Sequence, residues 1–459
     1  MTTTMTGWFA RARNPLPRST VRQRHAIRVK RLAEHLRTRR PTRSLSIQKR
    51  AVSHVVPKRD DRRHTDDKID ISDLDEIIDI DPVARTCTAQ PGVTFVALTE
   101  ETLRHGLVPV VVPELKTITI GGAVSGCSIE SMSFRYGGFH DSCREYEIVT
   151  ACGEVLRCTR DNENALVFEM MHGSFGTLGI LTKLTFDLVP AKPFVHVQYD
   201  TFTTLADYRD AIRAHFESED VDFMDGIVHS PTHFVLSLGT FVDDAPYQNR
   251  YDWMKVYWQS TAERREDYLA TADYFFRYDR GVTKVHPASF LGRLVFGKVL
   301  GSDRLLQIAN RWRRLVLPKE RPSVVVDVFL PCSTLDAFFG WYCDRIGHFP
   351  LWCVPYRRVR DYAWLAPETF AGVDDDLFID FGIYGAKQPP GRNLYRELEE
   401  VLQRVRGVKT LISYNYYEEE AFWRIFHKEN YAAVKKRVDP ANVLRDLYTK
   451  TCRASRGLD

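Results

Sequence analysis

The chain has 459 residues, of which 44% are hydrophobic, and its formal net charge is +4. This length exceeds the size at which one hydrophobic core stops growing, so we expect two compact units of ordinary soluble composition. No stretch approaches the roughly 18 uninterrupted apolar residues of a membrane-spanning helix, so the sequence predicts no such helix. The nine cysteines are irregularly spaced and include no CxxC pair. This spacing argues against a disulfide framework and a structural metal, and a reducing cytosol fits best.

The positive charge belongs to the N-terminal arm. Residues 1–59 hold 16 Lys or Arg and one acid, Glu34, so 48 of the 64 basic and 59 of the 60 acidic residues lie beyond them. A solvated tail, attraction to an anionic membrane surface, nucleic-acid binding and a mitochondrial transit peptide are the alternatives. No recognised nucleic-acid fold follows the arm, and we predict no nucleic-acid partner. We expect a cytoplasmic protein, with the arm providing peripheral contact to the inner face of the membrane.

The first third of the chain alternates between strands and helices. Residues 19–40 mix basic and spaced apolar side chains, which predicts an amphipathic helix that lies on lipid or docks on the body. Residues 94–105 predict a second helix, closed by Gly106 in the left-handed conformation. Short strands are expected over residues 45–56, over residues 69–80 around an acidic turn, and over residues 86–89. This alternation indicates an α+β domain.

A domain boundary is predicted at Pro190 and Pro193. Beyond it, alternating apolar residues predict an antiparallel sheet faced by helices, with its strands in residues 195–242 and 323–385. Residues 250–320 are rich in aromatic residues and arginine, and their pattern is mainly helical. Further helices are expected over residues 397–405 and 419–436.

Two glycine clusters carry the most chemical information. The first spans residues 113–123 with Gly121 and Gly122, and Gly126 follows it closely. Glycine costs about 1 kcal/mol in a regular element, so such a density marks sharp turns or a close approach to a ligand. Backbone N–H groups in such turns can bind a pyrophosphate without lysine. Tight hairpin turns without a ligand are the alternative.

The second cluster spans residues 172–182, and its glycines, Gly173, Gly176 and Gly179, follow a GxxGxxG spacing. It is not a Rossmann fingerprint, because the glycines precede a strand and no acidic residue follows at the ribose-binding distance. Alone, this segment is therefore weak evidence for a dinucleotide site.

Residues 147–153 lie between the two clusters and contain a hydrophobic run followed by a small residue and glycine. In this order, the three segments resemble the second half of the FAD-binding domain of the vanillyl-alcohol-oxidase family. The resemblance implies an α+β fold. It has a basic arm (1–40), a two-subdomain FAD-binding module (41–192), a substrate or cap domain with an antiparallel sheet (193–400), and a C-terminal helical segment that packs back on the flavin domain (401–459). The implied cofactor-binding residues are Thr119, Gly121, Gly122, Ala123, Gly126, Ser128, Tyr136, Gly137, His140, Gly176, Thr177, Gly179 and Ile180. No metal is expected.

Within that family, the chain most resembles the Δ24-sterol reductases and the actinobacterial enzymes that act with a methyltransferase on fatty acyl chains. The resemblance covers roughly residues 70–455, and its motifs lie at residues 112–115, 129–131, 136–137, 190–192, 351–355, 380–385 and 420–423. It implies FAD-dependent reduction of an isolated carbon–carbon double bond in a sterol side chain or a methylene-branched fatty acyl chain. It also implies NADPH as electron donor, a lipid substrate and a methyltransferase in the same pathway.

The chain departs from the family in its first pyrophosphate loop. That loop is usually rich in glycine and arginine, whereas residues 49–54 contain no glycine. Half of the cofactor site is therefore an open question. Some relatives attach FAD through a histidine, and His140 is the candidate here, with a structural role as the alternative. We predict noncovalent FAD.

Reduction of an unactivated alkene needs a positioned acid, because protonation must lead or accompany hydride transfer. Asp327 and Asp380 interrupt apolar strands, where a charge is costly unless it is paired. A solvent-facing position or an ion pair with arginine is the alternative for each. The candidate catalytic residues are Asp380, Tyr384, Asp327 and Tyr416, with Tyr414 beside them. Two other functions stay open, an FAD-dependent alcohol oxidase or dehydrogenase and a noncatalytic flavin- or lipid-binding protein.

Overall fold

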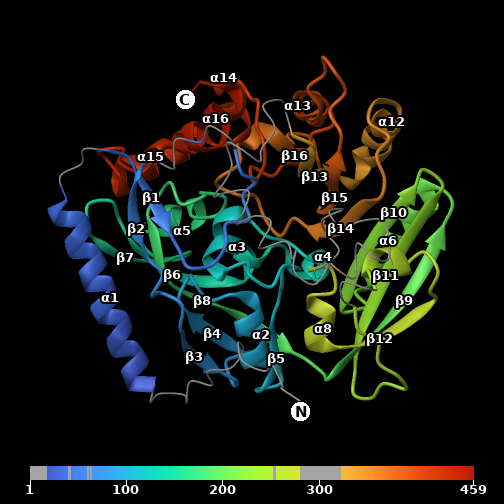
Figure 1. Ribbon diagram of the computed structural model, residues 1–459, viewed down its shortest axis with the longest axis horizontal. Coiled ribbons are helices and arrows are strands. Elements are labelled where there is room, and N and C mark those ends of the chain that lie inside the picture. Colours follow the sequence, from blue (N-terminus) through green and yellow to red (C-terminus); the bar gives the residue numbers. More distant parts are fainter. Residues whose placement is uncertain are drawn as a thin grey trace, which may run out of the picture.

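The protein is built around two large β-sheets that helices cover (Figure 1). The computed structural model describes residues 18–39, 43–58, 61, 65–251, 255–279 and 322–458. The predicted α+β class is confirmed. Within these ranges, the structure contains no helix that is both long and apolar enough to cross a membrane. Residues 1–17 and 40 of the predicted arm, and residues 252–254 and 280–320 of the predicted helical region, lie outside the described residues.

The first sheet has six strands from the N-terminal half of the chain. Five of them run in the order β3 (Ile77–Asp81), β4 (Thr86–Ala89), β8 (Ile180–Pro190), β6 (Cys143–Val149) and β7 (Val155–Thr159), and β5 (Leu107–Pro109) pairs with β8. Helix α2 (Phe95–Leu103) confirms the predicted helix, because the Thr94 side chain accepts a hydrogen bond from the Ala97 N–H and Gly106 has φ +67°.

A separate parallel pair, β1 (Leu45–Gln48) and β2 (Asp67–Asp70), precedes this sheet. The strand predicted over residues 45–56 is therefore wrong beyond Gln48. The chain leaves the pair there and reaches the segment that follows β16, where the Val56 N–H donates to the Ile412 carbonyl oxygen at 2.8 Å. The Val56 N–H is therefore hydrogen-bonded although this residue lies outside any strand.

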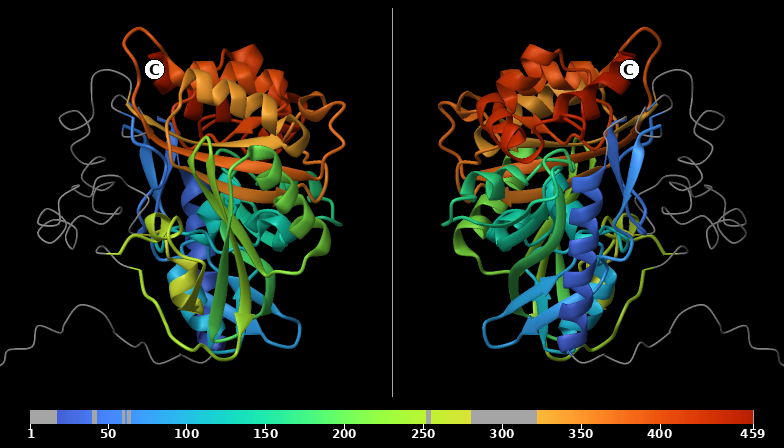
Figure 2. Two further views of the ribbon diagram at one scale, coloured as in Figure 1. Left: turned by 90° about the vertical axis from the view of Figure 1, so that its right-hand side faces the viewer. Right: turned by 90° about the vertical axis from the view of Figure 1, so that its left-hand side faces the viewer.

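Helix α1 (Arg18–Thr38) runs along the outside of the first sheet (Figures 1 and 2). Its buried apolar residues, Val29, Leu32, Ala33 and Leu36, pack in one cluster with Val149 and Ile180 of the sheet. Arg24 and Arg28 pair with Glu76 at 2.7 and 2.5 Å. The sequence left two placements open for this helix, on lipid or on the body of the protein. In the structure, the helix packs against the body.

The second sheet has eight strands, all antiparallel to their neighbours. Their order is β12 (Glu266–Ala270), β9 (Phe194–Phe202), β11 (His233–Val242), β10 (Phe223–Ser230), β14 (Leu351–Arg357), β15 (Leu377–Ala386), β13 (Val324–Pro331) and β16 (Val408–Lys409). The helical pattern expected from residue 250 is wrong at β12, which adds to the edge of β9. The last strand, β16, lies beyond residue 400, the predicted end of the cap domain.

Helices α6 (Leu205–Ser218), α12 (Leu335–Arg345) and α13 (Leu394–Arg404) contribute to a core with this sheet, in which Tyr208, Phe338 and Leu398 are buried. Shorter helices fill the connections, namely α3 (Ile120–Gly126), α4 (Ser133–Tyr136), α5 (Ala165–Met170), α7 (Tyr257–Ser260), α8 (Thr271–Phe275) and α16 (Ala454–Arg456).

The helix expected over residues 419–436 is two helices, α14 (Glu419–Ile425) and α15 (Lys428–Val438). The break falls at Phe426, which is extended, and at His427, whose side chain accepts a hydrogen bond from the Asn430 N–H and so begins a new helix. Helix α15 packs against the first half of the chain, where the Tyr431 hydroxyl donates to Thr177 Oγ1 at 2.9 Å.

Docking of α1 gives a stability prediction. Leu36 is 5% exposed and Ile27, on the same helix, is 67% exposed. We expect Leu36→Ala to destabilise the first unfolding transition by about 2–4 kcal/mol, because it removes buried methyl groups and leaves a cavity. Ile27→Ala should change it by less than about 0.5 kcal/mol. Denaturant unfolding of both variants measures this difference, and equal effects would show that α1 does not dock.

Candidate active site

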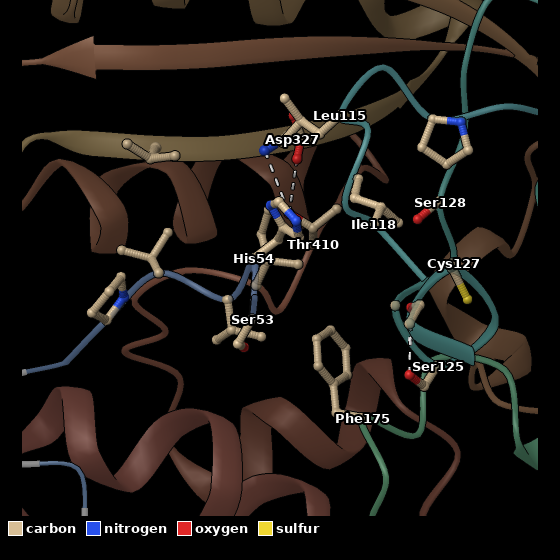
Figure 3. Close-up of a pocket in the computed structure, with 18 of the residues that line it drawn as sticks. Ser53, His54, Leu115, Ile118, Ser125, Cys127, Ser128, Phe175, Asp327 and Thr410 are labelled. Atoms are coloured by element: carbon tan, nitrogen blue, oxygen red, sulfur yellow. Dashed lines mark hydrogen bonds between the residues drawn. The ribbon is translucent and has the colours of Figure 1, made fainter. Parts of the chain in front are cut away.

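A large cavity lies between the two sheets (Figure 3). Its volume is about 1620 Å³, larger than the roughly 300–1,000 Å³ that is usual for small-molecule sites. Ser53 and His54 come from the segment after β1, Ser125 and Phe175 from the glycine turns, and Asp327 from the second sheet. The cavity therefore has room for a dinucleotide and a second molecule.

The first glycine turn brings backbone to the cavity wall. Thr119 precedes α3, and its side chain accepts a hydrogen bond from the Gly122 N–H at 3.3 Å. At Gly121, a Cβ would lie 2.5 Å from the Cβ of Pro91, so a larger residue does not fit without a shift. Glycine thus allows this turn to pack closely and leaves the cavity side free of side chains.

The second glycine turn lines the same cavity. Gly176 has φ +69° and Gly179 has φ +130°, two conformations that favour glycine. A Cβ at Gly176 would lie 3.0 Å from the Cδ1 of Ile47. Because both turns expose backbone rather than side chains, the residues present fit a flat anionic cofactor such as FAD.

The structure does not bring all the predicted cofactor residues to this wall. Those that line the cavity are Thr119, Gly121, Gly122, Gly126, Ser128, Gly176 and Gly179. Ala123, Thr177 and Ile180 are buried behind it, and Tyr136 and Gly137 do not line it. His140 lines a smaller chamber of about 80 Å³ together with Cys127 and Tyr362. Burial lowers the pKa of His140 to about 4, so this imidazole is neutral.

The second sheet contributes a cluster of acids to the cavity. Asp327 on β13 pairs in register with Gly382, and β15 carries Asp380 and Tyr384 on either side of that glycine. Alternation along a strand puts these side chains on one face. Glu114, from the first glycine cluster, completes the group. All four residues line the cavity.

Tyr384 and Asp327 form a hydrogen-bonded pair in which the tyrosine hydroxyl donates to the carboxylate. Thr410 Oγ1 lies 3.4 Å from Asp327 Oδ2 (Figure 3). A Cβ at Gly382 would lie 2.9 Å from the Cζ atom of Tyr384. This glycine therefore leaves the space in which the tyrosine ring lies.

Burial keeps Glu114 and Asp380 protonated near neutral pH. It raises the pKa of Glu114 to about 8 and raises that of Asp380 well above the usual range, with the charges of Asp327 and Glu114 adding to the effect on Asp380. Burial also raises the pKa of Asp327, although the Tyr384 hydrogen bond opposes this. The backbone of Val328 acts in the opposite direction and favours the ionised form of Asp380. Neither carboxyl oxygen of Asp380 makes a hydrogen bond within the described part of the chain.

Three of the four predicted catalytic residues, Asp327, Asp380 and Tyr384, meet in this cluster, whereas Tyr416 lies outside it. Tyr416 packs against Tyr395, with ring centroids 6.2 Å apart, and its N–H donates to Glu399. Tyr414 packs beside the same ring. Sequence reasoning missed Glu114 as an acid, although its place at the start of the glycine cluster was a usable signal.

Comparisons with known proteins agree with this geometry. Residues 61–159 match the family described as FAD binding domain. The human Delta(24)-sterol reductase is 27% identical over 406 residues, covering 83% of this chain and 77% of that protein. The Arabidopsis thaliana Delta(24)-sterol reductase is 24% identical over 427 residues, with coverages of 84% and 76%. Cytokinin dehydrogenase 6 of Oryza sativa subsp. japonica is 23% identical over 376 residues, with coverages of 75% and 69%. The resemblance inferred from the sequence is confirmed, because the chain contains a region similar to an FAD-binding domain and is similar over most of its length to Delta(24)-sterol reductases and a cytokinin dehydrogenase.

Proposed function

We propose that the protein reduces an isolated carbon–carbon double bond in a lipid, either a sterol side chain or a methylene-branched fatty acyl chain. The observation that carries this proposal is that the cavity wall contains buried carboxyl groups whose raised pKa values keep them protonated. Similarity to Delta(24)-sterol reductases supports it. FAD, when bound noncovalently at the glycine turns, supplies the two-electron redox chemistry, and NADPH is the proposed donor.

In this proposal Asp380 is the acid that protonates the alkene. Its carboxyl group is fully buried and lines the cavity. A neutral carboxylic acid can protonate an alkene carbon and leave the positive charge on the more substituted neighbour. The resulting carboxylate lies in a low-dielectric wall beside Glu114 and Asp327, so its raised pKa drives it to take up a proton again.

The remaining walls hold the substrate away from water. Leu115, Ile118, Phe329 and Trp352 line the cavity beside the acids. They offer apolar surface to a lipid and keep the dielectric constant near the acids low. An alcohol oxidase or dehydrogenase, the alternative function, would need a base to accept the hydroxyl proton. The raised pKa values of these carboxyl groups oppose that role.

An anaerobic visible spectrum of the purified protein tests the proposed function. We expect a flavin spectrum that NADPH bleaches and that a sterol with a side-chain alkene, or a methylene-branched acyl lipid, restores. Saturated analogues of the same lipids are the controls and should restore nothing. Bleaching by an alcohol, without any reoxidation by an alkene, would contradict the proposal and favour the dehydrogenase.

Removal of the proposed acid should slow catalysis without loss of the cofactor. We expect Asp380→Asn to lower kcat by about 10²- to 10⁴-fold, the usual contribution of a positioned general acid. Asp374→Asn is the matched control, because Asp374 is exposed and near the start of the same strand. Stopped-flow reoxidation by the alkene measures both variants. The account fails if Asp380→Asn retains the rate of the wild-type protein.

The rate should also depend on the ionisation of Glu114. Its pKa is raised to about 8, so it is neutral below that pH and negatively charged above it. The new charge makes Asp380 a weaker acid, because it opposes a second negative charge nearby. We therefore expect kcat to fall as the pH rises above about 8, and Glu114→Gln to abolish this decline. A pH–rate profile that declines in the same way in the variant would contradict this assignment.

A further inference from the structure

Two lysine ammonium groups reach the glycine turns of the cavity. Lys49 Nζ lies 3.2 Å from Thr119 Oγ1 and 3.6 Å from the position of a Cβ on Gly122. Lys450 Nζ donates to the Phe175 carbonyl oxygen at 2.5 Å and lies 3.8 Å from the position of a Cβ on Gly176. Both lysines line the main cavity. Each glycine turn therefore has one cation beside it.

Within the described part of the chain, no acid pairs with the ammonium group of Lys49. Among the described residues, its only hydrogen bond is the one with the Thr119 hydroxyl. Burial alone lowers its pKa, to about 8, and no carboxylate opposes this effect. The neighbouring Arg50 differs, because it is exposed and pairs with Asp75 at 2.6 Å. A half-buried cation that has no acidic partner among the described residues costs stability, so its position on the cavity wall indicates that an anion binds there.

Lys49 also begins the segment in which the chain departs from its family. Residues 49–54 contain no glycine, so this loop has no position that favours a close approach of backbone N–H groups to a phosphate. An ammonium group on a long side chain binds phosphate as a point charge and needs no special backbone conformation. A lysine can therefore supply the attraction that a glycine-rich loop would otherwise provide.

We propose that Lys49 and Lys450 bind the pyrophosphate of FAD between them, Lys49 at the Gly121 and Gly122 turn and Lys450 at the Gly176 turn. The two ammonium groups match the two negative charges of a pyrophosphate and take the place of the missing glycine-rich loop. This inference depends on the cofactor alone and stands whether the substrate is a lipid alkene or an alcohol.

The test is a binding titration that does not require turnover. FAD is removed from the purified protein, and FAD or riboflavin, which lacks the pyrophosphate, is titrated back by flavin fluorescence. We expect Lys49→Met to weaken FAD by about 10- to 100-fold, as for loss of a charge-assisted hydrogen bond, and to leave riboflavin unchanged. Lys450→Met should act in the same direction. Lys49→Arg should retain most of the affinity.

Lys387→Met is the matched control, because Lys387 also lines the cavity but is exposed and follows β15, which carries the acids. It removes the same charge from the protein and should leave FAD binding unchanged. A titration with NADPH distinguishes the other source of a pyrophosphate. Loss of NADPH binding with FAD binding intact would overturn the proposal, as would equal weakening of FAD and riboflavin by Lys49→Met.

Two further measurements separate lost binding from misfolding. Removal of an unbalanced buried cation should leave the melting temperature of the FAD-free Lys49→Met protein equal to or above that of the wild type. The wild-type affinity for FAD should fall as the pH rises above about 8, where Lys49 loses its proton, whereas Lys49→Arg stays charged and should show no such fall. A lower melting temperature in the variant or a flat pH dependence in the wild type would contradict the account.

Discussion

The cost of burying charge in one cavity explains the arrangement of the candidate site. The cavity lies between two sheets, and its two walls reduce this cost in different ways. On the wall where the second sheet faces Glu114, carboxyl groups avoid the cost by keeping their protons, as the raised pKa values of Glu114 and Asp380 indicate. On the glycine wall, Lys49 lies beside the exposed backbone of the first turn, with no acidic partner among the described residues. One wall therefore suits an uncharged, apolar molecule that needs a proton, and the other suits an anion.

The two walls are built by different kinds of structure. The glycine wall depends on local backbone conformation, since Gly176 and Gly179 adopt positive φ values and Gly121 packs against Pro91. The acid wall depends on strand register, which places Asp327 opposite Gly382 and so next to Asp380 and Tyr384. Helix α15 links the two halves of the chain, because Tyr431 and Lys435 bind Thr177 behind the second glycine turn.

Much of this organisation could be predicted from the sequence where the signal is local. The α+β class, the helix after Thr94 and the family resemblance follow from short motifs and are confirmed. The errors concern long-range partners. The strand from residue 45 ends at Gln48 because the chain crosses to the segment after β16, and β12 forms a strand because it pairs with the edge of β9. Likewise, Glu114 meets Asp380 only through tertiary folding, and Tyr416 was grouped with acids that it does not join.

The central claim is that the cavity wall holds neutral carboxylic acids at physiological pH. Infrared difference spectroscopy tests it most directly, because the carbonyl stretch of a protonated carboxyl group is separate from the bands of a carboxylate and shifts in D₂O. The account predicts protonated-carboxyl bands in the wild-type protein at pH 7, of which one is lost in Asp380→Asn and another in Glu114→Gln. Spectra at pH 7 in which both substitutions remove only carboxylate bands would contradict it.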